Sequence, residues 1–185
     1  MSRARAAAPR PVTLSPPLPW QIEVAGALIE GGATVAAVVP DSRLEGIVSR
    51  LGQTGLTVRT LAREEECVAY AAGQRLAGMR PVVLMQCSGL GNALNALGSL
   101  AIPYGLGIPL ILSMRGTLGE GNPAQVPMGG ATPALLAALG IQVFSLRDPG
   151  DVQRVVSGVL TLAYDAQACA AILLEPELGG GRERG

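Results

Sequence analysis

Residues 81–92 read PVVLMQCSGLGN, an apolar run rich in β-branched side chains that ends in a polar, glycine-rich turn. Such a short and uninterrupted apolar run is typical of a strand that is buried on both faces of a parallel sheet. The glycines permit a tight turn into the helix that we expect over residues 90–101. The stretch therefore predicts one strand, turn and helix of an α/β domain.

The same alternation of short apolar runs with longer amphipathic stretches continues in both directions along the chain. We predict strands over residues 34–39, 56–61, 81–87, 108–113, 142–144 and 170–174. We predict helices over residues 20–31, 42–51, 64–77, 90–101, 132–139 and 148–166. Ser42 is expected to cap the second of these helices. The alternation predicts a doubly wound α/β fold, with a mostly parallel six-stranded sheet and helices on both faces.

The two ends of the chain do not follow this alternation. Residues 1–19 are rich in Ala, Arg and Pro, and residues 179–185 contain only Gly, Arg and Glu. Segments of this composition have too few apolar side chains to form a core. We therefore expect a disordered leader over residues 1–19, one folded domain over residues 20–178 and a mobile tail over residues 179–185.

The composition excludes several classes of partner. Charged residues make up 15% of the chain, and Lys plus Arg equal Asp plus Glu at 14 each. We therefore expect no binding to nucleic acid or to an anionic membrane, both of which need a basic surface. No apolar run reaches the ~20 residues that span a bilayer. The low charge and the 25 glycines indicate extensive contact between subunits, so we expect an obligate oligomer.

Cysteine and histidine limit the chemistry further. The three cysteines, Cys67, Cys87 and Cys169, lack CxxC spacing, which is typical of reduced thiols in a cytoplasmic protein and not of disulfides or a metal site. Histidine is absent from the sequence, which removes the usual general base and the usual zinc ligand. Proton chemistry then needs carboxylates, a cofactor or another chain. We expect no metal ligand in this chain.

Polar and glycine-rich loops are predicted to gather at one edge of the sheet. In doubly wound sheets, ligands bind outside the carboxyl ends of the strands. The loops expected there contain Pro40-Asp41-Ser42, Arg63-Glu64, Ser88-Gly89-Leu90-Gly91-Asn92 and Arg115-Gly116. This clustering predicts a ligand site.

Three acidic residues, Glu64, Glu65 and Glu66, open the predicted third helix. Acidic side chains are stabilising there through the helix dipole, by ~0.3–1 kcal/mol each. Glu64, however, is followed nine residues later by Gly73 in a helix of small residues. In this respect the sequence resembles thiamine diphosphate enzymes, whose pyrimidine-binding domain has a strand-end Glu with this spacing. Many of those enzymes have His or Asn before that Glu, where this chain has Arg63.

The resemblance implies a specific role for Glu64. In these enzymes the Glu carboxylate hydrogen-bonds to the 1′ nitrogen of the aminopyrimidine and favours its imino tautomer. The imino nitrogen can then remove the thiazolium proton, so the cofactor itself supplies the base. By this resemblance, Glu64 is the catalytic residue of this chain, and histidine is dispensable.

Over residues 20–176 the sequence more closely resembles sulfopyruvate and phosphonopyruvate decarboxylases. The residues that carry this resemblance are VPDS at 39–42, MQCSGLGN at 85–92, MRG at 114–116 and NPAQVPMG at 122–129. It implies cofactor contacts at Glu64, Pro40, Ser88, Gly89, Leu90 and Asn92, and substrate contacts at Asp41, Ser42, Gln86, Arg115 and Gln125. Phosphonopyruvate enzymes more often have His directly after this Gln, so Val126 favours the sulfopyruvate branch.

Simpler explanations remain open for several of these residues. Asp41 is also suited to begin a turn, and Arg115 to form an ordinary surface salt bridge. The glycines of residues 88–92 serve equally to turn the chain from strand to helix. A phosphate cradle is a weaker alternative, because the loop lacks the Lys of a P-loop.

The second half of a thiamine diphosphate site is missing from the sequence. Such a site normally contains Gly-Asp-Gly and a later Asn that hold a divalent metal through oxygen ligands. The nearest approach here is Gly150-Asp151, which Val152 follows. We therefore expect a beta subunit that carries the diphosphate-binding domain and most of the Mg²⁺ site, in an alpha/beta hetero-oligomer.

The resemblance also implies a reaction on a small anionic 2-oxo acid. The expected reaction converts 3-sulfopyruvate to sulfoacetaldehyde and carbon dioxide, a step of coenzyme M biosynthesis. Phosphonopyruvate is the alternative substrate. A non-catalytic regulatory or binding subunit with the same fold also stays open, because fold alone does not determine function.

Overall fold

The structure, a computed structural model, describes residues 16–179. Most of the predicted leader and all but the first residue of the predicted tail lie outside the described residues. The strands are β1 (Val35–Val38), β2 (Thr57–Thr60), β3 (Pro81–Gln86), β4 (Pro109–Ser113), β5 (Gln142–Leu146) and β6 (Ala170–Leu174). They form one sheet in the order β2-β1-β3-β4-β6-β5, and every neighbouring pair is parallel. The predicted six-stranded sheet is confirmed.

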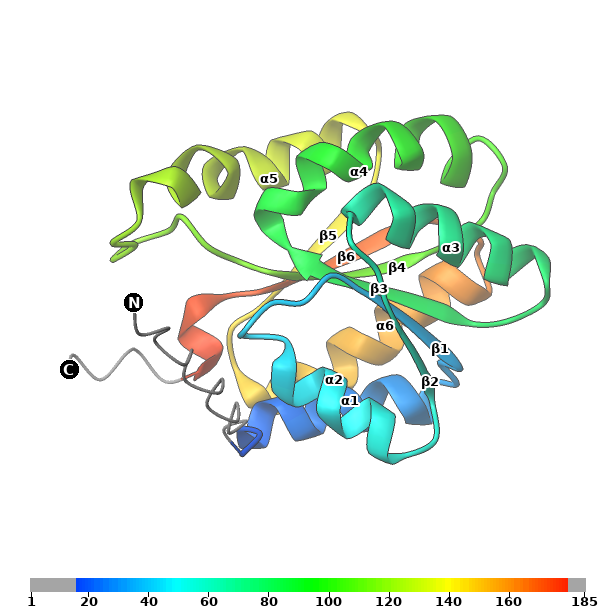
Figure 1. Ribbon diagram of the computed structural model, residues 1–185, viewed down its shortest axis with the longest axis horizontal. Helices are drawn as coiled ribbons and strands as arrows, with labels where there is room; N and C mark the ends of the chain where they lie inside the picture. The colour runs from blue at the N-terminus through cyan, green and yellow to red at the C-terminus, as the bar shows by residue number, and fades with distance from the viewer. Residues whose placement is uncertain (1–15, 180–185) are drawn as a thin grey trace, which may run out of the picture.

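Helices cover both faces of this sheet. They are α1 (Pro19–Glu30), α2 (Glu45–Gln53), α3 (Glu64–Leu76), α4 (Leu90–Ala96), α5 (Val126–Ala138) and α6 (Val152–Tyr164). Figure 1 shows α3, α4 and α5 on one face and α1, α2 and α6 on the other. The predicted doubly wound arrangement is therefore confirmed. No helix within residues 16–179 is both long enough and apolar enough to cross a membrane.

Alternate side chains of the central strands pack into two separate apolar layers. Val82 and Leu84 of β3 pack in the layer that contains residues of α1 and α6. Val83 and Met85 pack in the other layer, with residues of α3, α4 and α5. All four side chains are fully buried. This burial on both faces explains why β3 is an uninterrupted apolar run, as parallel strands usually are.

The loop between β1 and α2 differs from the prediction. Helix α2 begins at Glu45, with Leu44 before it, so Ser42 does not cap it. The backbone N–H of Arg43 instead donates to Asp41 Oδ1 at 3.1 Å, and the N–H of Leu44 donates to the Asp41 carbonyl at 3.0 Å. Asp41 thus organises a turn, which leaves Ser42 exposed and delays the helix.

Helix α5 begins six residues before the predicted start, at Val126. A single 3₁₀ turn, Pro123–Gln125, leads into it, and the Asn122 side chain caps that turn by accepting from the N–H of Ala124 at 3.1 Å. Pro127 lies in the first turn of the helix, where a missing N–H costs no hydrogen bond. The predicted helix over residues 90–101 also changes after Ala96 into a π-helical turn, Leu97–Ala101.

Candidate active site

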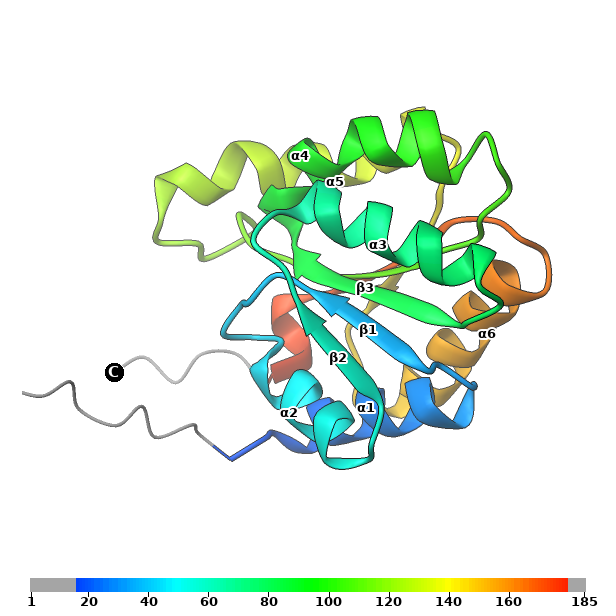
Figure 2. The ribbon, with the colours of Figure 1, turned by 45° about the vertical axis from the view of Figure 1, so that its right-hand side comes forward.

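The carboxyl ends of the strands all lie at one edge of the sheet. Figure 2 shows β1, β2 and β3 pointing toward the loops that lead into α2, α3 and α4. From β1 the chain passes to α2 on one face, and from the neighbouring β3 it passes to α4 on the other face. Ligands of doubly wound sheets bind where the connections diverge in this way. The candidate site is therefore centred on the ends of β1 and β3.

Glu64 is the first residue of α3 and faces the start of α4. Its Oε2 accepts a hydrogen bond from Asn92 Nδ2 at 2.9 Å. Gly89 lies directly against it, because a Cβ built at Gly89 would overlap the Glu64 side chain. Within the described part of the chain, Glu64 Oε1 takes part in no hydrogen bond. The carboxylate is thus held through Oε2, while Oε1 lies beside Gly89.

The two glutamates that follow have different partners. Glu66 Oε2 accepts from the backbone N–H groups of Ala62 and Arg63, both at 3.2 Å, and so caps the start of α3. Glu65 forms an ion pair with Arg63, with 2.6 Å between Oε1 and Nε. Local stabilisation of the start of α3 therefore explains the acidic residues Glu65 and Glu66. Of the three, Glu64 is the one that hydrogen-bonds to α4 within the described residues.

A hydrogen-bonded group joins the ends of β1, β3 and β4. Asp41 Oδ2 accepts from Gln86 Nε2 at 2.9 Å, and Asp41 Oδ1 accepts from Ser113 Oγ at 2.9 Å. Ser88 Oγ in turn donates to Gln86 Oε1 at 2.7 Å. The structure thus brings together Asp41, Gln86 and Ser88, as predicted, and adds Ser113, which the sequence analysis missed.

Cys87 lies between Gln86 and Ser88 in the chain and is buried. The N–H of Arg115 donates to its sulfur at 3.3 Å. Burial raises the pKa of the Cys87 thiol. The residue is therefore a packed thiol, as the sequence predicts for the cysteines, and not an activated nucleophile.

Arg115 is paired with Glu120, which the sequence analysis also missed. Its Nε and Nη2 donate to the two carboxylate oxygens of Glu120 at 2.7 and 3.0 Å. Glu120 also accepts from the N–H groups of Gly116 and Asn122, and its side chain is only 7% exposed. The hydrogen bond raises the pKa of Arg115 and lowers that of Glu120. The salt bridge that the sequence allowed as an alternative role of Arg115 is therefore present. Glu120 occupies one edge of the guanidinium.

Glu120→Gln is expected to remove an acid-sensitive part of the stability. The pKa of the Glu120 carboxyl is depressed in the folded chain, so its stabilisation is complete above the unfolded pKa of about 4.3 and is lost as pH falls below that value. The difference in melting temperature between wild type and variant should be largest near pH 7 and shrink toward pH 3. Thermal unfolding across this range checks it, and a constant difference would contradict the assignment.

The remaining predicted site residues lie at the same edge. Pro40 and Ser42 are exposed in the loop after β1, and Leu90 is buried at the start of α4. Gln125 is half-buried beside Gly116, and its Oε1 is shielded without a hydrogen-bond partner among the described residues. Such a buried acceptor is costly unless a ligand or partner satisfies it.

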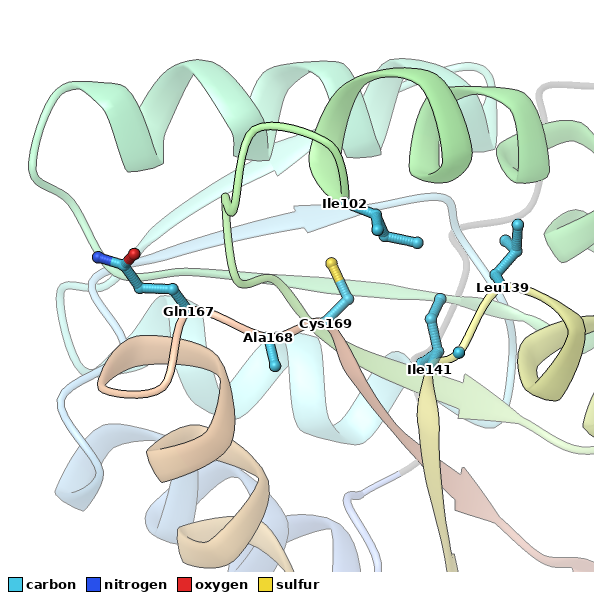
Figure 3. Close-up of a pocket in the computed structure, with 7 residues that line it drawn as sticks. Ile102, Leu139, Ile141, Gln167, Ala168 and Cys169 are labelled. Carbon is cyan, nitrogen blue, oxygen red and sulfur yellow. The ribbon is translucent and has the colours of Figure 1, made fainter.

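Cavities elsewhere in the structure do not coincide with this site. Figure 3 shows one of about 120 Å³, lined by Ile102, Leu139, Gly140, Ile141, Gln167, Ala168 and Cys169. These residues precede β4, β5 and β6 and so lie at the opposite edge of the sheet. The candidate site is instead an open edge, formed by one wall of side chains. Within residues 16–179, no group of three or more His, Cys, Asp or Glu side chains converges as a metal site would.

Comparison with known proteins identifies the family. No family model matches the chain. The sulfopyruvate decarboxylase subunit alpha of Methanococcus maripaludis is 34% identical over 150 residues, which cover 80% of this chain and 90% of that protein. The chain belongs to the family of sulfopyruvate decarboxylase alpha subunits. The resemblance indicated by residues 39–42 and 85–92 is thereby confirmed.

Other relatives of the family are longer than this chain. The sulfopyruvate decarboxylase of Methanosarcina acetivorans is 37% identical over 110 residues, which cover 60% of this chain but only 28% of that protein. The phosphonopyruvate decarboxylase of Streptomyces hygroscopicus is 34% identical over 125 residues, covering 66% of this chain and 31% of that protein. Both longer relatives therefore contain a large region that has no counterpart here.

A solved structure supports the fold alone. The 2-oxoglutarate:ferredoxin oxidoreductase from Magnetococcus marinus, solved with 2-oxoglutarate, coenzyme A and succinyl-CoA bound, matches with a TM-score of 0.66 and 18% identity. The match covers 97% of this chain and 33% of that one. The described fold thus recurs as one part of a larger enzyme.

Proposed function

We propose that this chain is the pyrimidine-binding alpha subunit of a split thiamine diphosphate-dependent decarboxylase that converts 3-sulfopyruvate to sulfoacetaldehyde and carbon dioxide. The observation that carries the proposal is the Glu64 carboxylate, fixed through Oε2 by Asn92 at 2.9 Å and packed on Gly89. The names of the alpha-subunit relatives support the same reaction. We also propose that the enzyme is cytoplasmic and acts in coenzyme M biosynthesis.

The residues at this edge fit the aminopyrimidine end of the cofactor. Glu64 has a free carboxylate oxygen that can accept a hydrogen bond from a ring nitrogen, and Asn92 keeps the carboxylate in place. The glycine at position 89 leaves room for that carboxylate beside α4. Thiamine diphosphate, when bound, supplies the electron sink for decarboxylation. Glu64 would hydrogen-bond to the aminopyrimidine and so control which of its nitrogens carries a proton. Pro40, Ser88 and Leu90 would be the neighbours of the aminopyrimidine.

The substrate side is formed by the ends of β1, β3 and β4. Gln86 and Ser42 offer an N–H and a hydroxyl, groups that hydrogen-bond to the oxygens of a 2-oxo acid. Arg115 keeps the guanidinium edge that Glu120 does not occupy, and a guanidinium suits a carboxylate or sulfonate. Gln125 lies beside this loop with an unsatisfied oxygen. We propose these residues as the substrate wall, with Asp41 behind Gln86.

The other wall of the site is proposed to come from a beta subunit. Within residues 16–179, no group of three or more His, Cys, Asp or Glu side chains is present to hold the metal that a diphosphate needs. The longer M. acetivorans relative supports this division, since this chain matches only 28% of its length. We propose an alpha/beta hetero-oligomer in which the beta subunit binds the diphosphate and Mg²⁺. The chain alone is then inactive.

The test combines this chain with the candidate beta subunit, thiamine diphosphate and magnesium. Carbon dioxide release is measured separately from sulfopyruvate and phosphonopyruvate, with each subunit omitted in turn as a control. The expected result is release from sulfopyruvate that requires both subunits. Turnover of phosphonopyruvate alone would establish the alternative substrate, which the S. hygroscopicus relative favours. No turnover of either substrate would leave a non-catalytic subunit and contradict the proposal.

A further inference from the structure

The hydrogen bonds between the ends of β1, β3 and β4 all run in one direction. Ser88 donates to the oxygen of the Gln86 amide, and the Gln86 nitrogen donates to Asp41. Ser113, which is fully buried, also donates to Asp41, as does the backbone N–H of Arg43. Three of these four bonds end on the Asp41 carboxylate, and the fourth, from Ser88, ends on the Gln86 amide that donates to it.

This direction follows from the chemistry of the acceptor. An ionised carboxylate has no proton to donate, so Gln86 must turn its NH₂ group toward Asp41 and its oxygen toward Ser88. The buried hydroxyl of Ser113 has no access to water and is satisfied through Asp41. Among residues 16–179, Asp41 uses one of the two amide hydrogens of Gln86, and the other takes part in no hydrogen bond.

We infer that Asp41 is a positioning residue that, anchored by Ser113, fixes the Gln86 amide so that Gln86 presents an N–H to the substrate. This role rests on the proposed function, which identifies the substrate as a 2-oxo acid. It replaces a direct contact of Asp41 with an indirect role. A 2-oxo acid with a second acidic group has no hydrogen-bond donor to offer Asp41, whereas its oxygens can accept from Gln86.

The sign of the change in KM distinguishes the two roles of Asp41. If Asp41 merely lies beside an anionic substrate, Asp41→Asn removes a repulsion and lowers KM. If Asp41 fixes Gln86, the amide introduced at position 41 donates a hydrogen bond to Gln86. The Gln86 amide then flips, so that its oxygen and not its N–H faces the substrate. KM should then rise about tenfold or more with little change in kcat, as expected for loss of a hydrogen bond to a charged group. An unchanged or lowered KM would overturn the inference.

Gln86→Glu gives a second test that does not require turnover. The introduced carboxyl would stand 2.9 Å from Asp41 Oδ2, where two carboxylates cannot both ionise freely. While protonated it donates to Asp41 as the amide does. Its folded pKa then lies above the unfolded value of about 4.3, so its melting temperature should fall increasingly below that of wild type as pH rises from 4 to 8.

The other charged or titratable groups near Asp41 do not produce this effect. Arg43 and Arg115 stay protonated across that range, and burial keeps the pKa of Cys87 raised. Glu175, which neighbours Arg43, is present equally in wild type and variant. The pH-dependent difference therefore reports on positions 41 and 86.

Two further variants complete the experiment on the alpha/beta complex. Asp41→Asn combined with Gln86→Glu should abolish the pH-dependent deficit, because one carboxylate then accepts from the amide at position 41 and from Ser88. Gln153→Glu is the matched control, since Gln153 Nε2 donates to Glu30 Oε2 at 3.2 Å on an exposed surface, where solvent screens the pair.

The control should show no deficit of comparable size. A pH-independent Gln86→Glu difference, or equal deficits in Gln86→Glu and Gln153→Glu, would overturn the inference. If the wild-type complex decarboxylates neither 2-oxo acid, the proposed function fails, and the melting experiment still decides the orientation of Gln86.

Discussion

Glu64→Gln is expected to lower kcat of the alpha/beta complex by about 10²- to 10⁴-fold, the usual contribution of a group that controls proton transfer. The amide keeps an oxygen that can accept from Asn92, so the contact between α3 and α4 should survive. It cannot, however, stabilise a protonated ring nitrogen as a carboxylate does. The loss should therefore appear in kcat, while the melting temperature stays close to that of wild type.

Glu65→Gln is the matched control for this substitution. Glu65 stands next to Glu64 in the same helical turn, yet its carboxylate pairs with an exposed Arg63 side chain. Solvent screens an ion pair with so exposed a partner, and no hydrogen bond joins this pair to α4 within the described residues. Turnover of Glu65→Gln should remain near that of wild type. Equal losses in both variants, or near-normal activity of Glu64→Gln, would remove Glu64 from its proposed role.

The fold could be predicted because the central strands are buried on both faces. Strands β3 and β4 are short runs that are apolar up to their last residue, and this pattern has few other structural explanations. The errors lie where side chains and backbone form local hydrogen bonds. Asp41 accepts a hydrogen bond from the N–H of Arg43, and α2 begins after this turn. Asn122 caps a 3₁₀ turn, so that α5 begins at Val126, earlier than predicted. A polar side chain can form a turn or cap a helix, and no periodic pattern in the sequence shows which of the two it does.

The site could be predicted as a group of loops, but not in its internal contacts. Parallel topology brings Glu64, Asp41 and residues 86–92 to one edge. Which of three consecutive glutamates faces α4 depends on the packing of two helices, so only the resemblance to known enzymes indicated Glu64. Ser113 was missed because a serine at the end of an apolar strand has no distinguishing pattern.

Glu120 was missed for a different reason. The glycines around it indicated a loop without showing that the loop turns back on Arg115. Gly116, between these two residues, adopts a positive φ of 75°, a conformation that favours glycine, in the loop that brings Glu120 back to Arg115. An acidic side chain five residues after a basic one, with a glycine between them, is a weak sequence signal for such a salt bridge.

Gly89→Ala is expected to abolish most of the turnover without a change in any charged or hydrogen-bonding side chain. The backbone at Gly89, with φ of −71° and ψ of −16°, is one that alanine adopts readily, so backbone strain is not the cause. The added methyl group would instead overlap the Glu64 side chain. Glu64 must then rotate away from α4 and lose Asn92, and overpacking of this kind costs about 1–3 kcal/mol.

The origin of that loss can be established by combining substitutions. In a Glu64→Ala background the methyl group at position 89 meets no carboxylate, so the stability cost of Gly89→Ala should largely vanish, which is the non-additivity expected of residues in contact. Gly158→Ala in α6 is the control, because a Cβ there meets no atom within 4 Å and alanine is the better helix former. Thermal unfolding and kcat of the four variants decide the matter. If Gly89→Ala costs as much stability without the Glu64 carboxylate as with it, position 89 acts on the turn itself, and the close packing of Gly89 on Glu64 is not what holds that carboxylate in the site.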